Sequence, residues 1–280
     1  MKKYYITTTL PYVNSDPHVG FAMEIIRADA IARAKRLQGF DVFFNTGTDE
    51  HGLKIYEKAL NQGESTQAFV DHYAEKFKEL KGILGISDIH FIRTTDKHHI
   101  KAAQEFWKRC KDNGYIYKKL YKTKYCTGCE LEKTDTELEN GKCIIHQNLD
   151  ILLIEEENYF FKFSEFQKPL LELYKKNPHL VVPDFRFNEI KAFVERGLQD
   201  FSISRLKSKM PWGVDVPDDN EHVMYVWLDA LMNYITALGY GTDDKNMNFW
   251  PANIHLVGKD ILRFHAIYWP AFLMSLDLPL

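Results

Sequence analysis

Two pairs of metal-binding residue types stand close together in the middle of the chain. Cys126 and Cys129 form a C-x-x-C pair, and Cys143 and His146 form a second pair after a short loop. Thiolate and imidazole groups at this spacing are typical ligands of a tetrahedral Zn²⁺ ion. Four protein ligands leave no open coordination position, so the pattern predicts a structural zinc site rather than a catalytic one. The alternative, free thiols beside a surface histidine, is less favoured because few apolar residues surround the cluster.

A second group with chemical potential is the segment His18-Val19-Gly20-Phe21, which stands where a helix is predicted to begin. The first N–H groups of a helix have no partner within it and the helix dipole is positive there, so this position suits phosphate groups. Gly20 has no Cβ and lets a sugar or a base approach the backbone. His18 adds a donor for phosphate oxygens. The segment is therefore a candidate site for a nucleoside triphosphate.

Hydrophobic periodicity indicates the elements that position these groups. Residues 3–9 and 41–45 are predicted to be buried strands, because β-branched and aromatic residues are frequent in them. Residues 18–38 between them are predicted to form a helix. This order is a βαβ unit with parallel strands, and ligands bind at the carboxyl ends of such strands. The apolar face predicted for the helix consists of Val19, Met23, Ile26, Ala30, Ala34 and Leu37.

Helices and strands continue to alternate along the chain, which predicts an α/β fold. Residues 115–163 lack helical periodicity and contain the metal cluster, so we interpret them as an inserted subdomain. Further strands are predicted at residues 222–227 and 254–257. Further helices are predicted at residues 49–61, 66–84, 96–113, 164–177, 187–198, 228–238 and 261–275.

Composition and charge exclude several classes of protein. The chain has 280 residues, a formal net charge of −3 and 45% hydrophobic residues. A weakly negative chain does not coat DNA or RNA by bulk electrostatics, although it can touch RNA over a small area. No apolar run approaches the roughly 20 residues of a membrane span, and no secretion signal is found, so we expect a cytoplasmic location without membrane contact. Cys110, near Phe106 and Trp107, is interpreted as a buried small residue.

Four motifs, in this order along essentially the whole chain, resemble the methionyl-tRNA synthetase family of class I aminoacyl-tRNA synthetases. A single Cys₃His cluster agrees with the same family. The motifs are Thr9-Leu10-Pro11-Tyr12-x-Asn14-x-x-x-His18-Val19-Gly20, Thr46-Gly47-Thr48-Asp49-Glu50-His51-Gly52, Tyr225-Val226-Trp227-Leu228-Asp229-Ala230-Leu231 and Gly258-Lys259-Asp260-Ile261-Leu262-Arg263-Phe264-His265.

The resemblance implies a Rossmann-type nucleotide-binding domain with a parallel sheet, interrupted by a connective insertion that carries a zinc knuckle. Residues 1–114 and 188–280 are expected to form the two halves of the catalytic domain. Residues 115–187 are expected to form the insertion, with the zinc knuckle at residues 126–146. The family's KMSKS-type lysine loop and its anticodon-binding domain would follow residue 280, so we interpret the chain as truncated before them.

The implied reaction is ATP-dependent activation of L-methionine to methionyl-adenylate, with Mg²⁺ accompanying ATP, and transfer of the methionyl group to the 3′ end of tRNA(Met). Without the lysine loop, the fragment is expected to bind methionine but to activate it poorly. The resemblance assigns catalysis to His18 and Gly20, and ATP binding to His18, Gly20, Phe21, Gly258 and Asp260. It assigns amino-acid binding to Leu10, Tyr12, Asp49, Trp227, Ala230, Tyr234, Ile261 and His265, with Asp49 on the substrate ammonium.

The expected pocket is chemically coherent with a thioether substrate. Aromatic walls suit a polarisable sulfur, with sulfur–ring contacts worth roughly 0.3–1.5 kcal/mol. One methylene is worth only ~1–3 kcal/mol, so rejection of leucine needs shape plus a polar contact to sulfur, for which Tyr12 and His265 are candidates. Taken singly, Asp49 has an alternative interpretation as a helix N-cap. Trp227, Tyr234, Ile261 and His265 have one as ordinary core residues.

Phe21 departs from the family pattern, because the HIGH-type signature usually has its second histidine there. Three alternatives also stay open. A leucine, isoleucine or valine synthetase would carry a larger editing insertion, and a cysteine synthetase would need an open zinc position in its pocket. A non-catalytic RNA-binding module would use the basic and aromatic residues 118–124. An unrelated HxGH nucleotidyltransferase would lack the motifs around Trp227 and Gly258.

Overall fold

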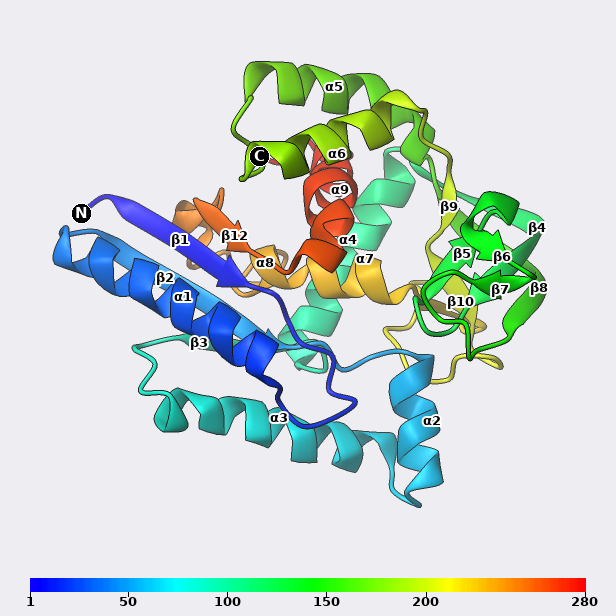
Figure 1. Cartoon of the computed structure of the whole chain (residues 1–280), viewed down its shortest axis with the longest axis horizontal. Coiled ribbons are helices and arrows are strands. Elements are labelled where there is room, and N and C mark those ends of the chain that lie inside the picture. The colour runs from blue at the N-terminus through cyan, green and yellow to red at the C-terminus, as the bar shows by residue number, and fades with distance from the viewer.

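A parallel sheet lies at the centre of the computed structural model (Figure 1). Its strand order is β12 (Ile254–Leu256), β1 (Lys3–Thr8), β2 (Asp41–Thr48) and β3 (His90–Arg93), and each neighbouring pair is parallel. The predicted βαβ unit is confirmed, and β3 is a strand that the sequence pattern did not reveal. The structure describes the backbone of residues 1–280 and all side chains except those of Tyr121, Thr123, Glu132 and Ile154.

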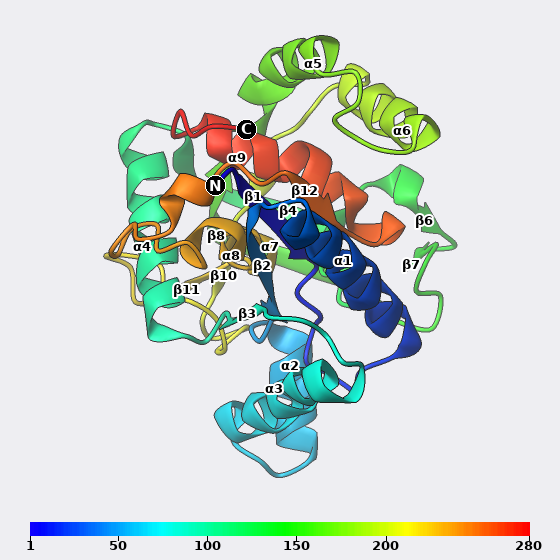
Figure 2. The ribbon, with the colours of Figure 1, turned by 90° about the vertical axis from the view of Figure 1, so that its left-hand side faces the viewer.

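Both faces of this sheet are covered, as the alternation of side chains along β1 requires. Tyr4 and Ile6 pack in one core with α1 (Val19–Leu37) and α3 (Thr66–Ile83), and Figure 2 shows α1 running along the sheet. Tyr5 points to the opposite face, where its hydroxyl donates to the carbonyl of Tyr234 at 2.7 Å. The chain therefore meets the pattern of an α/β fold with a buried central sheet.

Further helical segments follow along the chain. None of the helices that the structure describes is both long and apolar enough to cross a bilayer. The other α-helices are α2 (Leu53–Asn61), α4 (Lys97–Asp112), α5 (Gln167–Lys176), α6 (Asp184–Glu195), α7 (Val226–Leu231), α8 (Asn233–Thr236) and α9 (Trp269–Met274). Short 3₁₀ turns occupy Asp135–Glu137, Phe163–Phe166, Met247–Phe249 and Lys259–Ile261, and a π-helical turn occupies Phe264–Tyr268.

The buried face of α1 differs from the predicted one. Phe21, Ile25, Ala28 and Ala32 are buried, whereas all six residues of the predicted face are exposed. Both sets recur at intervals of three and four residues, so apolar periodicity alone does not choose between them. The buried stripe combines one large ring with small alanines, which let the helix approach the sheet closely. The exposed residues are Val19, Met23, Ile26, Ala30, Ala34 and Leu37.

The strand predicted at residues 222–227 is also corrected. β11 (His222–Met224) ends before Tyr225, pairs antiparallel with β10 (Ser204–Leu206) and lies outside the parallel sheet. Tyr225 has an extended backbone and caps α7, so the predicted helix begins earlier and is divided into α7 and α8. A continuous run of buried apolar residues is compatible with either a strand or a buried helix. The sequence pattern therefore does not show where the strand ends and the helix begins.

A second sheet, entirely antiparallel, follows α4. β4 (Ile116–Cys126) pairs with β8 (Ile151–Phe161) along its whole length, with β5 (Leu131–Lys133) and β9 (Phe201–Ser202) at the two edges. A small pair, β6 (Leu138–Glu139) and β7 (Lys142–Cys143), carries part of the metal cluster. This sheet accounts for the absence of helical periodicity in residues 115–163. The boundaries at residues 114 and 187 stay predictions, and β9 lies beyond the second of them.

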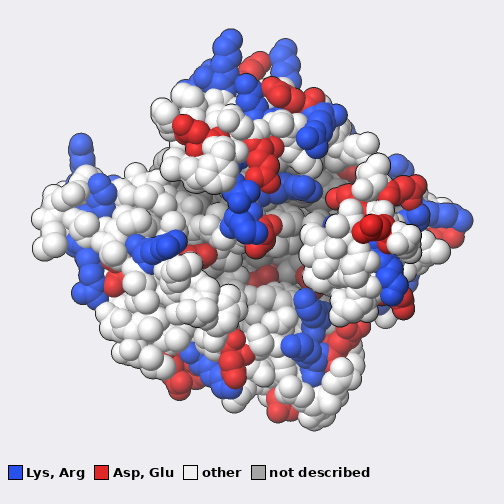
Figure 3. Space-filling model, in the orientation of Figure 1, with Lys and Arg blue, Asp and Glu red and all other residues white. Residues whose placement is uncertain are grey.

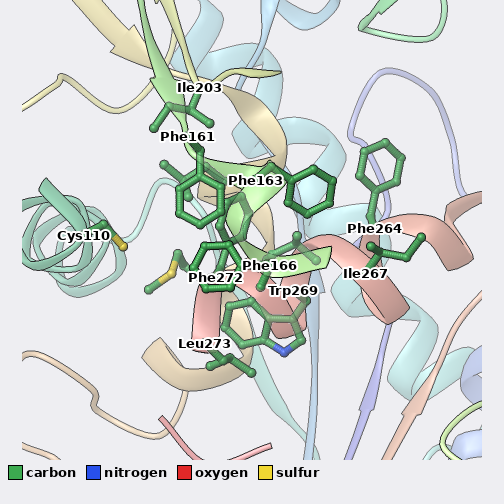
Figure 4. Close-up of a cluster of buried hydrophobic side chains, with 14 of the residues drawn as sticks. Cys110, Phe161, Phe163, Phe166, Ile203, Phe264, Ile267, Trp269, Phe272 and Leu273 are labelled. Atoms are coloured by element: carbon green, nitrogen blue, oxygen red, sulfur yellow. The ribbon is translucent and has the colours of Figure 1, made fainter. Parts of the chain in front are cut away.

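The largest hydrophobic core joins the antiparallel sheet to the C-terminal helices (Figure 4). Phe161 stacks on Phe166 with centroids 5.3 Å apart and meets Phe272 of α9 edge-on at 4.9 Å. Cys110 is buried in the same core, as expected, with its Sγ 3.1 Å from Oγ of Ser275. This packing fixes the π-helical turn that carries His265 against the end of the parallel sheet.

Candidate active site

A cavity of about 250 Å³ lies at the carboxyl ends of β1 and β2, the place where ligands bind in parallel α/β folds. The loop after β1, the end of β2, α7, α8 and the zinc-knuckle segment (residues 126–146) form its walls. Figure 3 shows the surface hollowed at the centre of this face. Every residue expected in the amino-acid pocket lines this cavity, namely Leu10, Tyr12, Asp49, Trp227, Ala230, Tyr234, Ile261 and His265.

The carboxylate of Asp49 is the strongest chemical feature of the cavity. The side chain is buried, and its Oδ1 has no hydrogen-bond partner among the residues that the structure describes. Burial, together with the nearby carboxylates of Asp229 and Glu130, raises the pKa of Asp49 well above its usual value. A cationic ligand group would supply the missing partner and offset this repulsion. Asp49 does not cap α2, because the N-cap residue of that helix is Gly52.

Tyr234 and His265 form a hydrogen-bonded pair in the wall of the cavity. Nδ1 of His265 lies 2.9 Å from the carbonyl oxygen of Ile261, so this nitrogen carries the proton and donates it. Nε2 then accepts from the hydroxyl of Tyr234 at 2.7 Å. Burial lowers the pKa of His265 to about 4, so the imidazole is neutral at neutral pH. The pair is therefore an uncharged polar wall with a fixed orientation.

The ring of Trp227, which lines the cavity, is stacked on the ring of Phe264. Their rings are parallel within 5° and their centroids lie 3.6 Å apart. Trp227 comes from α7 and Phe264 from the π-helical turn, so the stack joins two of the predicted motifs in space. Such a surface offers the sulfur–ring contacts expected for a thioether.

Asp229 and Glu130 are carboxylates at or near the cavity that the sequence analysis did not single out. Asp229 is buried and accepts hydrogen bonds from His51 at 2.7 Å and from His99 at 2.9 Å. Burial opposes ionisation, but the two imidazoles lower the pKa of Asp229 to about 2. Its position within the Trp227 motif was the available signal. Glu130 lines the cavity from the zinc-knuckle segment, directly after Cys129, and accepts a hydrogen bond from Tyr12.

The start of α1, where the phosphate site is predicted, is capped by the preceding histidine. His18 caps the helix, and its Nδ1 accepts from the backbone N–H of Gly20 at 3.1 Å. A Cβ at Gly20 would lie 2.9 Å from the ring of His18, so this close approach requires glycine. Phe21 is buried and meets Phe77 edge-on at 5.4 Å, which places it beneath the helix start rather than on its surface.

Gly258 and Asp260 are exposed just after the carboxyl end of β12. Gly258 caps the turn Lys259–Ile261, and Asp260 forms an ion pair with Lys259. Neither residue lines the amino-acid cavity. Because β12 and β1 are parallel neighbours, their carboxyl ends lie at the same edge of the sheet.

The predicted metal ligands come together in space. One ligand atom from each of Cys126, Cys129, Cys143 and His146 lies within 4.8 Å of the others, and Sγ of Cys129 is 3.6 Å from Sγ of Cys143. Tetrahedral bonds of about 2.3 Å place two zinc-bound sulfurs roughly 3.8 Å apart. A Cβ at Gly128 would lie 2.5 Å from Cγ of His146, so the imidazole is seated where only glycine leaves room. The residues therefore fit a structural zinc ion.

The basic strand at residues 118–124 is largely neutralised within the protein. Lys118 pairs with Asp219 at 3.0 Å, and Lys122 pairs with Glu155 at 2.8 Å. Lys124 likewise forms an ion pair with Asp135, in the 3₁₀ turn that follows β5. This arrangement is that of an ion-paired sheet surface, and it gives the RNA-binding alternative no specific support.

A family model described as "tRNA synthetases class I (M)" matches residues 4–137 and 126–280. The chain belongs to this synthetase family. Among synthetase relatives, the methionine–tRNA ligase of Thermotoga maritima is 50% identical over 283 residues, which cover 99% of this chain and 44% of that protein. The methionine–tRNA ligase of Brucella suis biovar 1 is 47% identical and is matched over 100% of this chain and 55% of its own length.

Solved synthetase structures agree with the fold. Mycobacterium tuberculosis methionyl-tRNA synthetase in complex with methionyl-adenylate matches 100% of this chain and 56% of its own, with a TM-score of 0.94 and 44% identity. The free-state structure of the M. tuberculosis synthetase gives a TM-score of 0.85 with 41% identity, over 100% of this chain and 54% of its own. The predicted α/β fold is thereby confirmed. The chain spans about half the length of the relatives that it matches.

Proposed function

We propose that this chain is the amino-acid-activating part of a methionine–tRNA ligase. In this proposal ATP and L-methionine form methionyl-adenylate and pyrophosphate, and the methionyl group then passes to the 3′ end of tRNA(Met). The observation that carries the proposal is the unpartnered Oδ1 of buried Asp49 in a cavity with aromatic walls. The names of the relatives and the methionyl-adenylate in a similar solved structure support the same substrate.

The proposed role of Asp49 is to bind the ammonium group of the amino acid. An ion pair in a buried site fixes the direction of the substrate and leaves its carboxylate free to attack the α-phosphorus of ATP. The α-phosphorus forms a bond to a carboxylate oxygen, and pyrophosphate leaves with the electron pair of the broken P–O bond. We assign the phosphates of ATP, with their Mg²⁺, to the start of α1 and to His18 and Gly20. Phe21 would support this site from beneath.

Selectivity for methionine would arise mainly from shape and from the aromatic wall. Tyr12 and His265 were the sequence-based candidates for a polar contact to sulfur. The hydroxyl of Tyr12 donates to Glu130, and both ring nitrogens of His265 have partners within the protein. We therefore propose that Trp227, whose ring is stacked on Phe264, contacts the thioether, while Tyr234 and His265 set the depth of the cavity.

The remaining assignments follow the family. Gly258 and Asp260 are proposed to contact the adenosine ribose. The metal cluster would hold a structural zinc ion, which supplies cross-linking of the segment and no chemistry in the reaction. We expect these 280 residues to bind methionine, because they contain the whole lining of the cavity. Because the product serves translation, the cytoplasm is the proposed location.

The proposal is tested by the thermal stability of the zinc-loaded chain with L-methionine, leucine, isoleucine, cysteine or homocysteine. A ligand at 100 times its dissociation constant adds about 2.7 kcal/mol to the folded state. We expect methionine to raise the melting temperature most. A larger effect of leucine or cysteine would identify a different amino acid, and no effect of any of them would overturn the proposal.

A further inference from the structure

Glu130 belongs to the zinc-knuckle segment but lies in the wall of the amino-acid cavity. It follows the metal-ligand position Cys129 directly, and its backbone has a φ of 51°, in the left-handed region that glycine prefers. This backbone conformation costs free energy for a non-glycine residue, so it persists only where other contacts hold the residue in place. The contacts of Glu130 show what holds it.

Two tyrosines from outside the knuckle bind Glu130. The hydroxyl of Tyr12, on the loop after β1, donates to Oε1 of Glu130 at 2.9 Å, although the two residues are 118 positions apart. The hydroxyl of Tyr225, the residue that caps α7, donates to the carbonyl oxygen of Glu130 at 2.9 Å. Tyr225 is buried, so the backbone of Glu130 is anchored to the same helix that presents Trp227.

The backbone at the start of α2 closes around the Tyr12–Glu130 pair. A Cβ at Gly52 would lie 2.1 Å from the hydroxyl oxygen of Tyr12 and 3.4 Å from Oε1 of Glu130. Gly52 has a φ of 122°, and its N–H donates to the carbonyl of Trp212 at 3.1 Å. The hydroxyl of Tyr12 is therefore confined between the zinc-knuckle segment and α2, which leaves little space for it to hydrogen-bond to another residue.

We propose that Glu130 is a positioning residue that holds Tyr12 in the wall of the amino-acid cavity, and that it couples metal binding in the knuckle to amino-acid binding. Cys129 is covalently next to Glu130, so a bound metal fixes the backbone that presents the Glu130 carboxylate. Tyr12 lies on the same loop as Leu10, so the hydrogen bond from Tyr12 to Glu130 also holds the loop that carries Leu10 in the cavity wall. The identity of the amino acid rests on the proposed function, whereas the Glu130–Tyr12 coupling itself does not.

Coupling of this kind is reciprocal, because any factor by which the metal raises amino-acid affinity is also the factor by which the amino acid raises metal affinity. L-Methionine should thus slow the transfer of zinc from the protein to the chelator 4-(2-pyridylazo)resorcinol. Tyr12→Phe, a change outside the knuckle, should speed this transfer even without an amino acid. A residue that served the knuckle fold alone would produce neither effect.

The experiment compares the 280-residue chain with Glu130→Ala, Glu130→Gln and Tyr12→Phe, after zinc content has been measured for each. We expect Glu130→Ala to weaken L-methionine binding about tenfold by titration calorimetry, because the hydrogen bond that holds the Tyr12 hydroxyl is lost. Glu130→Gln keeps an acceptor oxygen, and about threefold weakening is expected. Glu139→Ala is the matched control, since Glu139 is an exposed carboxylate on β6 of the same knuckle.

The outcomes separate this inference from the proposed function. If the unmodified chain binds methionine and Glu130→Ala binds it equally well with its zinc retained, the coupling is wrong. If the unmodified chain does not bind methionine, the proposed function fails, and zinc transfer from Tyr12→Phe still decides the inference. Transfer at the unmodified rate then overturns it, and faster transfer with an unchanged Glu139→Ala control supports it.

Discussion

Nδ1 of His51 lies 2.7 Å from Oδ2 of Asp229, and both side chains are buried. His51 follows the end of β2, and Asp229 lies on α7, so this contact joins the segment that presents Asp49 to the helix that presents Trp227. His99 of α4 binds the other oxygen of Asp229. A single carboxylate therefore ties three elements together beside the cavity.

Asp229→Asn should lower the free energy of unfolding by about 3 kcal/mol at neutral pH, because it leaves two buried imidazoles without their anion. The measurement is chemical denaturation of the zinc-loaded chain. Asp88→Asn, which changes a side chain that is 92% exposed, is the control and should have little effect. Equal stability of the two variants would show that the bridge contributes nothing.

Because of the same carboxylate, the protein should become less stable at acidic pH. The pKa of Asp229 is about 2 in the folded chain, below the ordinary value of 3.8. Its contribution, on the order of 2 kcal/mol, is therefore present above about pH 4 and is lost as the pH falls from 4 towards 2. Unfolding curves across this window should show the loss in the unmodified chain and a smaller one in Asp229→Asn.

Asp49→Asn should weaken L-methionine binding by at least roughly 30-fold, because the proposed ion pair loses its buried anion. Stability should stay the same or rise, since the raised pKa of Asp49 shows that its charge is unfavourable in the empty cavity. Calorimetric titration and denaturation of the same sample measure the two effects. Retained affinity would remove Asp49 from the amino-acid site.

Methionine binding should strengthen with rising pH. The pKa of Asp49 is raised by burial and by nearby carboxylates, so in the empty protein the group becomes anionic only at a pH above its ordinary value of 3.8. As the pH rises over this range, the unliganded protein loses stability because Asp49 ionises while it is buried. A bound ammonium group pairs with this carboxylate and offsets the loss. Titrations at increasing pH should give falling dissociation constants, and Asp49→Asn should lack the trend.

Gly128→Ala should weaken zinc binding roughly 10–100-fold, because the added Cβ displaces the His146 imidazole that it would meet at 2.5 Å. Competition with a chelator measures the affinity, and removal of zinc should lower the melting temperature of the unmodified chain. Gly82→Ala is a matched control, since a Cβ there has no neighbour within 4 Å. If both variants hold zinc equally tightly, the site does not include His146 as placed.

Phe21→His should preserve or raise the rate of adenylate formation in a chain extended to the full length of its relatives, because it restores a donor of the HIGH-type signature. It should also cost about 1–3 kcal/mol of stability, because Phe21 is buried against Phe77. Pyrophosphate exchange and denaturation measure the two effects, with Phe21→Leu as the apolar control. A tenfold slower rate at equal folding would contradict the expectation.

The cavity could be predicted from the sequence because its residues stand at the ends of strands and at the starts of helices. Asp49 directly follows β2 and Trp227 lies in the first turn of α7, so the motifs mark the places where a parallel sheet presents its ligand site. The metal ligands were predictable for another reason, since two close pairs define a site by spacing alone. These signals survive in a single sequence.

Other features depend on how the chain closes in three dimensions. The contact of Tyr12 with Glu130 and the contact of His99 with Asp229 join distant segments, and neither pair shares a motif. The buried face of α1 was missed because two apolar stripes have the same period, and only the neighbouring sheet selects one. Tertiary packing decides such cases, and one sequence carries no record of it.

The strand β1 acquires one of its two neighbours only after a long intervening stretch of chain has been synthesised. β1 lies between β2 and β12, and the backbone N–H of Tyr5 donates to the side chain of Asn253, which is 248 positions away. During translation β1 therefore emerges with one edge unpaired, and it stays so until nearly all of these residues have left the ribosome. An open strand edge is a template for association with other chains. Protection of the nascent chain during this interval is a requirement that the order of strands itself imposes.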